Sequence, residues 1–276
     1  MIKGDYHIHS SFSSDSKASM EQTIEMAISK GLERICFTDH MDLHYPKTSG
    51  GYDFVFDLED YINKLDTLKL KYSDKIKIMT GIELGLQPYI KNELYNLSQS
   101  KFLDFVIGST HVIDNIDPYY SDYWVDKTVT NVINRYYEIV LSNCTEMSEC
   151  FDVYGHIDYI IRYIPKHMKE NLRHHECSYE SFKDLVDEIL KTIIYKGKGI
   201  EINTSGFKYD LGCPHPEKAI LNRYYELGGE IITVGSDAHI SEHIAYDFSK
   251  AEAILKEIGF KYYTIFEDRK PTFIKL

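Results

Sequence analysis

The segment Asp5-Tyr6-His7-Ile8-His9 lies at the end of a short apolar run close to the beginning of the chain. If residues 3–9 form a strand, successive side chains point to opposite faces, so His7 and His9 project from the same face. Two imidazoles at this spacing can bind one metal ion while Ile8 packs on the other face. Taken alone, such a pair is more often structural than metal-binding.

The last expected core strand ends in a similar pair. The segment Ser236-Asp237-Ala238-His239 follows the apolar run 230–234, and it again offers two ligand-type residues at positions i and i+2. Such pairs at the ends of the first and last core strands are typical of a closed barrel with metal ions at one mouth.

Between these two segments, expected strands alternate with expected helices. The strands are expected at 3–9, 34–37, 77–82, 103–108, 151–154, 199–203 and 230–234, and 261–276 is expected to form a terminal strand or hairpin. This alternation predicts a parallel sheet with right-handed crossovers. We count seven βα units, one fewer than in a regular TIM barrel. Because no linker or repeat divides the chain, we expect residues 1–276 to form a single α/β domain.

Ligand-type side chains follow almost every expected strand. In a parallel barrel all carboxyl ends of the strands open on one face, so these side chains would converge there. A set of histidines and carboxylates without thiolates suits Zn, Mn or Fe. The residues are His7, His9, His40, Glu83, His111, His156, Asp237 and His239.

Composition excludes several classes of function. The net charge of −12 argues against non-specific binding of nucleic acid, which requires a basic surface. The chain contains no apolar run near the roughly 20 residues that span a bilayer, and its start lacks a signal-peptide core. Five cysteines without a C-x-x-C pair indicate reduced thiols, so we expect a cytoplasmic protein without membrane partners. The oligomeric state is left open.

These segments resemble the polymerase and histidinol phosphatase (PHP) family. The resemblance rests on the first H-x-H, on T-D-H at 38–40, on Glu83, on S-T-H at 109–111, on G-H at 155–156 and on S-D-A-H at 236–239. It implies a distorted seven-stranded βα barrel and a centre of three divalent metal ions.

The resemblance also implies a distribution of ligands. His7, His9, Glu83 and Asp237 would hold the first ion, and Glu83 would bridge to a second ion held by His111 and His156. His40 and His239 would hold the third. Many family members supply a histidine from the loop after the first strand, but residues 10–17 contain none, so we expect Asp15 to be the ninth ligand.

Within this family, the tracts at 155–163 and 201–206 look most similar to the histidinol-phosphate phosphatases. This implies hydrolysis of L-histidinol phosphate to L-histidinol and inorganic phosphate, a step of histidine biosynthesis. A metal-bound hydroxide would attack phosphorus, and Glu83 and Asp237 would be the catalytic carboxylates. Whether Asp237 or the third ion assists the leaving group is left open.

Four further residues are candidates for contacts with the small phosphorylated substrate. Arg162 is the first choice for a phosphate clamp, and Lys208 is a weaker one. Ser109 could donate a hydrogen bond beside His111, and His243 could touch an imidazole. Each is also compatible with a structural or surface role. Glu201 and Asn203 face one way on their strand, and we expect them to support the ligands if they point inward.

Three alternatives remain open. A sister enzyme of the same family could act on a nucleotide or another small phosphoester. A metallo-amidohydrolase is disfavoured, because no expected strand ends in the lysine that such sites often use. A non-enzymatic metal-binding module is ranked last, since three shared ions would leave open coordination positions.

Overall fold

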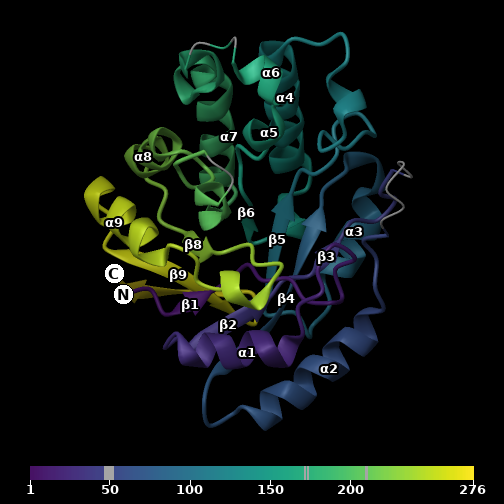
Figure 1. Cartoon of the computed structure of the whole chain (residues 1–276), viewed down its shortest axis with the longest axis vertical. Helices are drawn as coiled ribbons and strands as arrows, with labels where there is room; N and C mark the ends of the chain where they lie inside the picture. The colour runs from purple at the N-terminus through teal and green to yellow at the C-terminus, as the bar shows by residue number, and fades with distance from the viewer. Residues whose placement is uncertain (47–52, 171, 173, 209–210) are drawn as a thin grey trace.

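The computed structural model describes residues 1–46, 53–170, 172, 174–208 and 211–276. Seven parallel strands follow one another in the central sheet, in the order β1-β2-β4-β5-β6-β7-β8 (Figure 1). The short strand β3 pairs with β4 next to β2. The bounds are β1 Gly4–Asp5, β2 Arg34–Phe37, β3 His40–Met41, β4 Lys77–Gly85, β5 Phe105–Ser109, β6 Val153–Tyr154, β7 Gly199–Asn203 and β8 Ile232–Gly235.

The sheet curls into a nearly closed barrel because its last strand returns to its first. The amide of Tyr6 donates to the carbonyl of Val234, and Ile8 forms a parallel bridge with Ala238. The amide of Asp237 also donates to the carbonyl of His7. The predicted seven-stranded α/β barrel is therefore confirmed, and its closure brings the two H-x-H-like segments together.

Helices cover the outside of the barrel (Figure 1). Their apolar faces pack on the strands, as Ile24 and Ala27 of α1 and Leu65 of α2 illustrate by being fully buried. The helices are α1 Met20–Ser29, α2 Leu58–Lys71, α3 Lys91–Ser98, α4 Val129–Glu146, α5 Ile160–Tyr163, α6 Lys166–Lys169, α7 Lys183–Tyr195, α8 Lys218–Glu226 and α9 Phe248–Ile258. None of the helices in the described part of the chain combines the length and the apolar character that a membrane span requires.

The amino ends of the strands are covered by the hairpin of β9 (Tyr262–Glu267) and β10 (Lys270–Lys275). The hydroxyl of Tyr6 donates to the carbonyl of Phe266, and the amide of Ile232 donates to Thr264. The hairpin predicted at 261–276 is thus confirmed. It seals the end of the barrel opposite the strand ends that carry His7 and Glu83.

Most strand bounds differ from the prediction by a few residues, and two of these differences bear on the site. The first strand is regular only at Gly4–Asp5, because beyond it the chain alternates between partners on β8 and Thr38. Strand β4 continues past Glu83 to Gly85, because β3 and β5 pair with it on both sides at that level. Glu83 therefore lies within a paired strand rather than at its end.

Candidate metal centre

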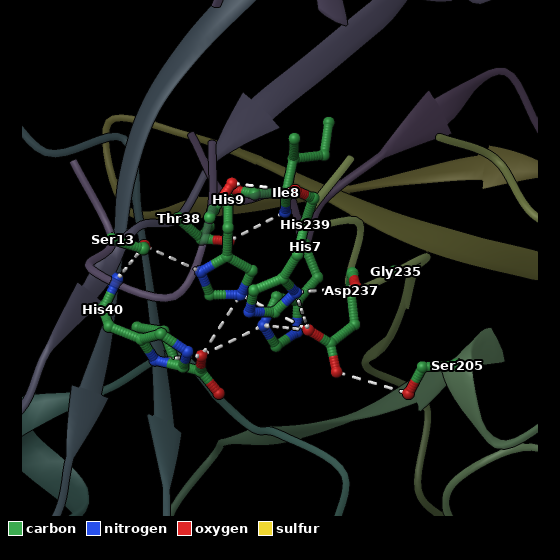
Figure 2. A network of polar contacts seen from close by, with 12 residues as sticks. His7, Ile8, His9, Ser13, Thr38, His40, Ser205, Gly235, Asp237 and His239 are labelled. Carbon is green, nitrogen blue, oxygen red and sulfur yellow. Dashed lines mark hydrogen bonds and ion pairs between the residues drawn. The ribbon is translucent and has the colours of Figure 1, made fainter. Parts of the chain in front are cut away.

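The nine residues expected to be ligands meet at the carboxyl ends of the strands. Figure 2 shows the rings of His7, His9, His40 and His239 turned toward one another and toward the carboxylate of Asp237. Distant segments supply them: β1 and the loop after it, β3, β4, the ends of β5 and β6, and the loop after β8. The shared strand-end position explains why residues far apart in sequence converge.

Glu83 stands at the centre of the group and is fully buried. Its Oε2 lies 3.1 Å from Nε2 of His7 and 3.0 Å from Nδ1 of His40. Its Oε1 lies 2.8 Å from Nε2 of His156 and 3.2 Å from Nε2 of His111. The two oxygens thus face two different sets of imidazoles, which is the arrangement that a bridging carboxylate requires.

Asp237 lies close to His7, one of the imidazoles that face Oε2 of Glu83. Its Oδ1 is 3.4 Å from Nε2 of His9 and 3.8 Å from Nε2 of His7. Its other oxygen accepts a hydrogen bond from the hydroxyl of Ser205 at 3.3 Å (Figure 2). One oxygen of this carboxylate is therefore held by protein while the other faces the histidines.

Asp15 reaches the group from the loop after β1. Its Oδ2 lies 3.1 Å from Nε2 of His239 and 3.7 Å from Nε2 of His40. The ring of His9 stacks on that of His239 with centroids 4.1 Å apart. The acid that replaces the histidine of the family pattern therefore lies beside the two imidazoles with which it is expected to act.

The donor atoms fit divalent metal ions. Within the described residues, four overlapping groups of three side chains have ligand atoms within 4.8 Å of one another. Nε2 of His7, Nε2 of His9 and Oε2 of Glu83 are buried and find no hydrogen-bond partner among the residues that the structure describes. Burying such groups unpaired costs about 1–3 kcal/mol each, and cations between them would remove that cost. Imidazole and carboxylate donors without thiolate suit Zn, Mn or Fe.

The charges of the site attract cations. Burial raises the pKa of the Glu83 carboxyl, but His7, His111 and His40 together hold that pKa well below its usual range. Burial lowers the pKa of His40, yet Glu83 and Asp15 raise it to about 9. The carboxylates therefore create a negative potential in which protons bind tightly, and metal ions compete with protons for the same nitrogen atoms.

Hydrogen bonds from residues behind the expected ligands fix the orientation of the imidazoles. Nδ1 of His7 lies 2.7 Å from Oε1 of Glu201, whose Oε2 accepts from the amide of His156 at 3.1 Å. The side-chain amide of Asn203 donates to Glu201 and to Asp237. Glu201 and Asn203 do point inward, which was the condition for the supporting role expected of them. Such contacts set the tautomer and direction of a metal-binding histidine.

Two supporting residues were missed by sequence reasoning. Asp42 is buried, and its Oδ2 lies 2.7 Å from Nδ1 of His111. Ser13 contacts Nδ1 of His9 and the amide of His40 (Figure 2). Its hydroxyl donates to Oδ1 of Asp39. Asp42 could have been found from the sequence, because it follows His40 at the same i, i+2 spacing as the other ligand pairs. Ser13 lies in a polar loop with no pattern.

The candidate substrate residues lie at different distances from the mouth. Arg162, from α5, lines a pocket of about 160 Å³ that also contains Asp15, His40 and His111. The hydroxyl of Ser109 is buried and donates to Oε1 of Glu83 at 2.7 Å. Lys208 donates to the backbone carbonyls of Ser236 and Asp237. His243 ends a short 3₁₀ helix, with its ring 5.8 Å from that of Tyr246.

Comparisons with known proteins agree on a family. A family model described as the PHP domain matches residues 5–205. The chain is 33% identical over 270 residues to a histidinol-phosphatase of Lactococcus lactis, covering 98% of this chain and 96% of the relative. It is 32% identical over 257 residues to a probable histidinol-phosphatase of Clostridium acetobutylicum, covering 93% of this chain and 94% of the relative.

A solved structure is similar over the same length. It is the histidinol phosphate phosphatase of Lactococcus lactis in complex with zinc, L-histidinol and phosphate. The TM-score is 0.87 at 32% identity, with 98% of each chain covered. The similarity therefore extends well beyond residue 205, where the match to the family model ends.

Proposed function

Since the chain belongs to the PHP family, we propose that it is a histidinol-phosphatase, which hydrolyses L-histidinol phosphate to L-histidinol and inorganic phosphate. One observation carries this proposal. The two oxygens of Glu83 face two sets of imidazoles beside a pocket lined by Arg162, in a chain similar to histidinol-phosphatases along nearly its whole length. The proposal includes all of residues 1–276 as one unit.

The centre is proposed to hold three divalent ions. His7, His9 and Asp237 would take one ion with Oε2 of Glu83, and His111 and His156 a second with Oε1. Asp15, His40 and His239 would take the third. Zinc is the first candidate because the similar Lactococcus structure contains it, and iron and manganese also suit the donors. Bound ions supply Lewis acidity to the phosphoryl group and lower the pKa of a coordinated water.

The residues around the ions have separate roles. The guanidinium of Arg162 is proposed to bind the phosphate, since a planar fork can donate two hydrogen bonds to phosphate oxygens. Asp237 and Glu83 would hold the ions, and a role of Asp237 in protonating the leaving alkoxide stays a prediction. Ser109 is proposed to orient Glu83, and Lys208 to steady the backbone at Asp237. A direct contact of His243 with the imidazole of the substrate stays a prediction.

The cellular context is part of the same proposal. A substrate of histidine biosynthesis and five cysteines without disulfides both favour a reducing compartment, the cytoplasm.

The test is release of inorganic phosphate by the zinc-loaded protein. L-histidinol phosphate is compared with nucleoside monophosphates and with an aryl phosphate at equal concentrations. We expect turnover of L-histidinol phosphate to exceed that of the other esters by at least about 100-fold, because polar recognition groups in a pocket discriminate strongly. Preference for a nucleotide would move the chain to a sister function on the same barrel. Hydrolysis of none of these esters would contradict a phosphatase.

A further inference from the structure

The loop after β1, which carries the expected ninth ligand, contains five serines, and they fall into two groups. Ser10 and Ser13 are fully buried, and Ser16 is 6% exposed. Ser11 and Ser14 are exposed. A buried hydroxyl is costly unless it forms hydrogen bonds, so the buried serines require partners within the protein. Those partners show what holds the loop.

The first anchor of the loop is the buried carboxylate of Asp39, which precedes His40 in sequence. Its Oδ1 accepts from the amide of Ser10 at 2.6 Å and from the amide and hydroxyl of Ser13 at 3.1 and 2.8 Å. Its Oδ2 accepts from the hydroxyl of Ser10 at 2.9 Å. The hydroxyl of Ser13 also accepts from the amide of His40 at 3.0 Å (Figure 2). This part of the loop is therefore tied to the segment that supplies His40.

The second anchor is Ser16, which ties the loop to the segment after β8. Its hydroxyl donates to the carbonyl of His239 at 2.9 Å and accepts from the amide of Ala18 at 3.2 Å. The amide of Ser16 donates to the carbonyl of Ser13 at 3.0 Å, and the amide of Ser11 donates to the carbonyl of Ala18 at 2.9 Å. The two anchors are thus joined through a backbone that is itself closed by hydrogen bonds.

Asp15 lies between the two anchors, and its own partners belong to the same two segments. Its Oδ2 lies 3.1 Å from Nε2 of His239 and 3.7 Å from Nε2 of His40. Ser13 binds the segment of His40, and Ser16 binds the segment of His239. Because the side chain of Asp15 is 31% exposed, packing restrains it little, and its position depends on the backbone that carries it.

Ser13 also determines which nitrogen of His9 carries a proton. The hydroxyl of Ser13 donates its proton to Oδ1 of Asp39, so it acts as an acceptor toward Nδ1 of His9, 3.1 Å away. Nδ1 of His9 therefore carries the proton of the neutral imidazole, and Nε2 keeps the lone pair that a metal ion requires.

We propose that Asp39, Ser13 and Ser16 are positioning residues that fix Asp15 between His40 and His239 and thereby strengthen binding of the third ion. This inference rests on the proposed function, which assigns those three side chains to that ion. The carboxylate of an aspartate extends less far from the backbone than Nε2 of a histidine, so the loop must approach the ion closely. A loop anchored on both sides of its ligand loses little freedom when an ion binds, which raises affinity.

The test compares Ser16→Ala with Ser14→Ala, which removes an exposed hydroxyl from the same loop. Zinc is titrated in competition with a fluorescent chelator, without substrate, and bound zinc per chain is counted. We expect Ser16→Ala to bind one of three ions about 10- to 100-fold more weakly and the other two as the wild type does, because a residue that orients a ligand is lost. Ser14→Ala should stay within about twofold of the wild type for all ions.

The variant Asp15→Ala separates positioning from a general loosening of the fold. It should weaken the same ion, and adding Ser16→Ala to it should cause little further loss, because the ligand through which Ser16 acts is gone. Thermal melting shows that each variant is folded. Full additivity of the two substitutions, equal losses in Ser16→Ala and Ser14→Ala, or wild-type zinc binding by Ser16→Ala would overturn the inference.

Failure of the proposed function would be recognised separately, as a wild-type protein that binds zinc but releases no phosphate from L-histidinol phosphate. The zinc titrations contain no substrate, so they test the anchors in that case as well. If the wild type is active, Ser16→Ala should need about 10- to 100-fold more zinc than Ser14→Ala for half-maximal phosphate release. The same zinc requirement in both variants would count against the positioning role.

Discussion

At the scale of single residues, the geometry of Glu83 distinguishes a metal centre from a cluster of buried polar side chains. An ordinary buried glutamate would direct both oxygens to hydrogen-bond donors. Here Oε2 is buried without a hydrogen-bond partner in the described part of the chain, although imidazole nitrogens of His7 and His40 lie within 3.1 Å. Those nitrogens and Oε2 are therefore available to a shared ion, as the proposed centre requires.

The substitution Glu83→Gln tests this assignment. A carboxamide offers one oxygen and no charge, so it cannot serve two ions. We expect kcat/KM to fall by roughly 100-fold or more, a loss at least equal to that caused by removing a residue that supports a ligand. Metal content per chain, measured after dialysis, should fall as well.

The matched control for this experiment is Glu93→Gln, which changes an exposed glutamate of α3. It should leave both metal content and activity within about twofold of the wild type. Retention of full metal content and activity by Glu83→Gln would refute the bridging role.

Single residues also show where sequence reasoning succeeded and where it could not. The position of His7, His9, Asp237 and His239 at one mouth was predictable because each pair directly follows an apolar run, although Asp237 has a positive φ and does not continue the alternation of a strand. Asp15 was named by elimination within one short loop, and the structure places it beside His239 and His40. Ser16 carried no local pattern, because its partner His239 comes from the far end of the chain.

At the scale of elements, the pairing of β3 with β4 determines how His111 is held. The register places His40 opposite Glu83 and Met41 opposite Leu84, so Asp42 follows beside Gly85. A Cβ atom at Gly85 would lie 2.5 Å from Cγ of Asp42. Glycine at this position therefore leaves room for the carboxylate that contacts His111.

Two substitutions test this arrangement from opposite strands. Gly85→Ala should displace the Asp42 carboxylate, and Asp42→Asn should keep its shape but remove its charge. In both variants we expect metal affinity to fall about 10- to 100-fold, because His111 loses the partner that orients it. The affinity is measured by titrating zinc in competition with a fluorescent chelator that reports free zinc. Thermal melting shows that each variant is folded.

Asp53→Asn, at an exposed position of the connection that follows β3, serves as the control and should bind zinc as the wild type does. Wild-type affinity in Asp42→Asn would contradict the role of β3.

The elements themselves were largely predictable. The strands at 34–37 and 199–203 were found where expected, because apolar runs are local signals. Strand β3 was not among the expected strands, because two paired residues are too few to produce a periodic pattern. Missing β3 is also why Asp42 was missed.

At the scale of the whole molecule, the apolar packing that stabilises the barrel and the candidate metal centre lie at opposite ends of the strands. The β9–β10 hairpin seals the amino ends of the strands, where Tyr6, Phe105 and Phe266 pack with ring centroids 5.0–5.5 Å apart. The opposite mouth contains buried carboxylates and imidazoles, which do not pack as an apolar core does. Each strand contributes apolar residues to the core and a polar residue near its carboxyl end to the site. Residues from nearly the full length of the chain are therefore needed for one site.

The measurement that tests the central claim most directly is recovery of histidinol phosphatase activity during metal titration. The protein is stripped with a chelator, and phosphate release from L-histidinol phosphate is followed as zinc is added, with bound metal counted on the same samples. We predict that the stripped protein is inactive and that activity rises with zinc and saturates only after more than one ion per chain, near three. Full activity in the stripped protein, or no activity once the sites are filled, would contradict the account.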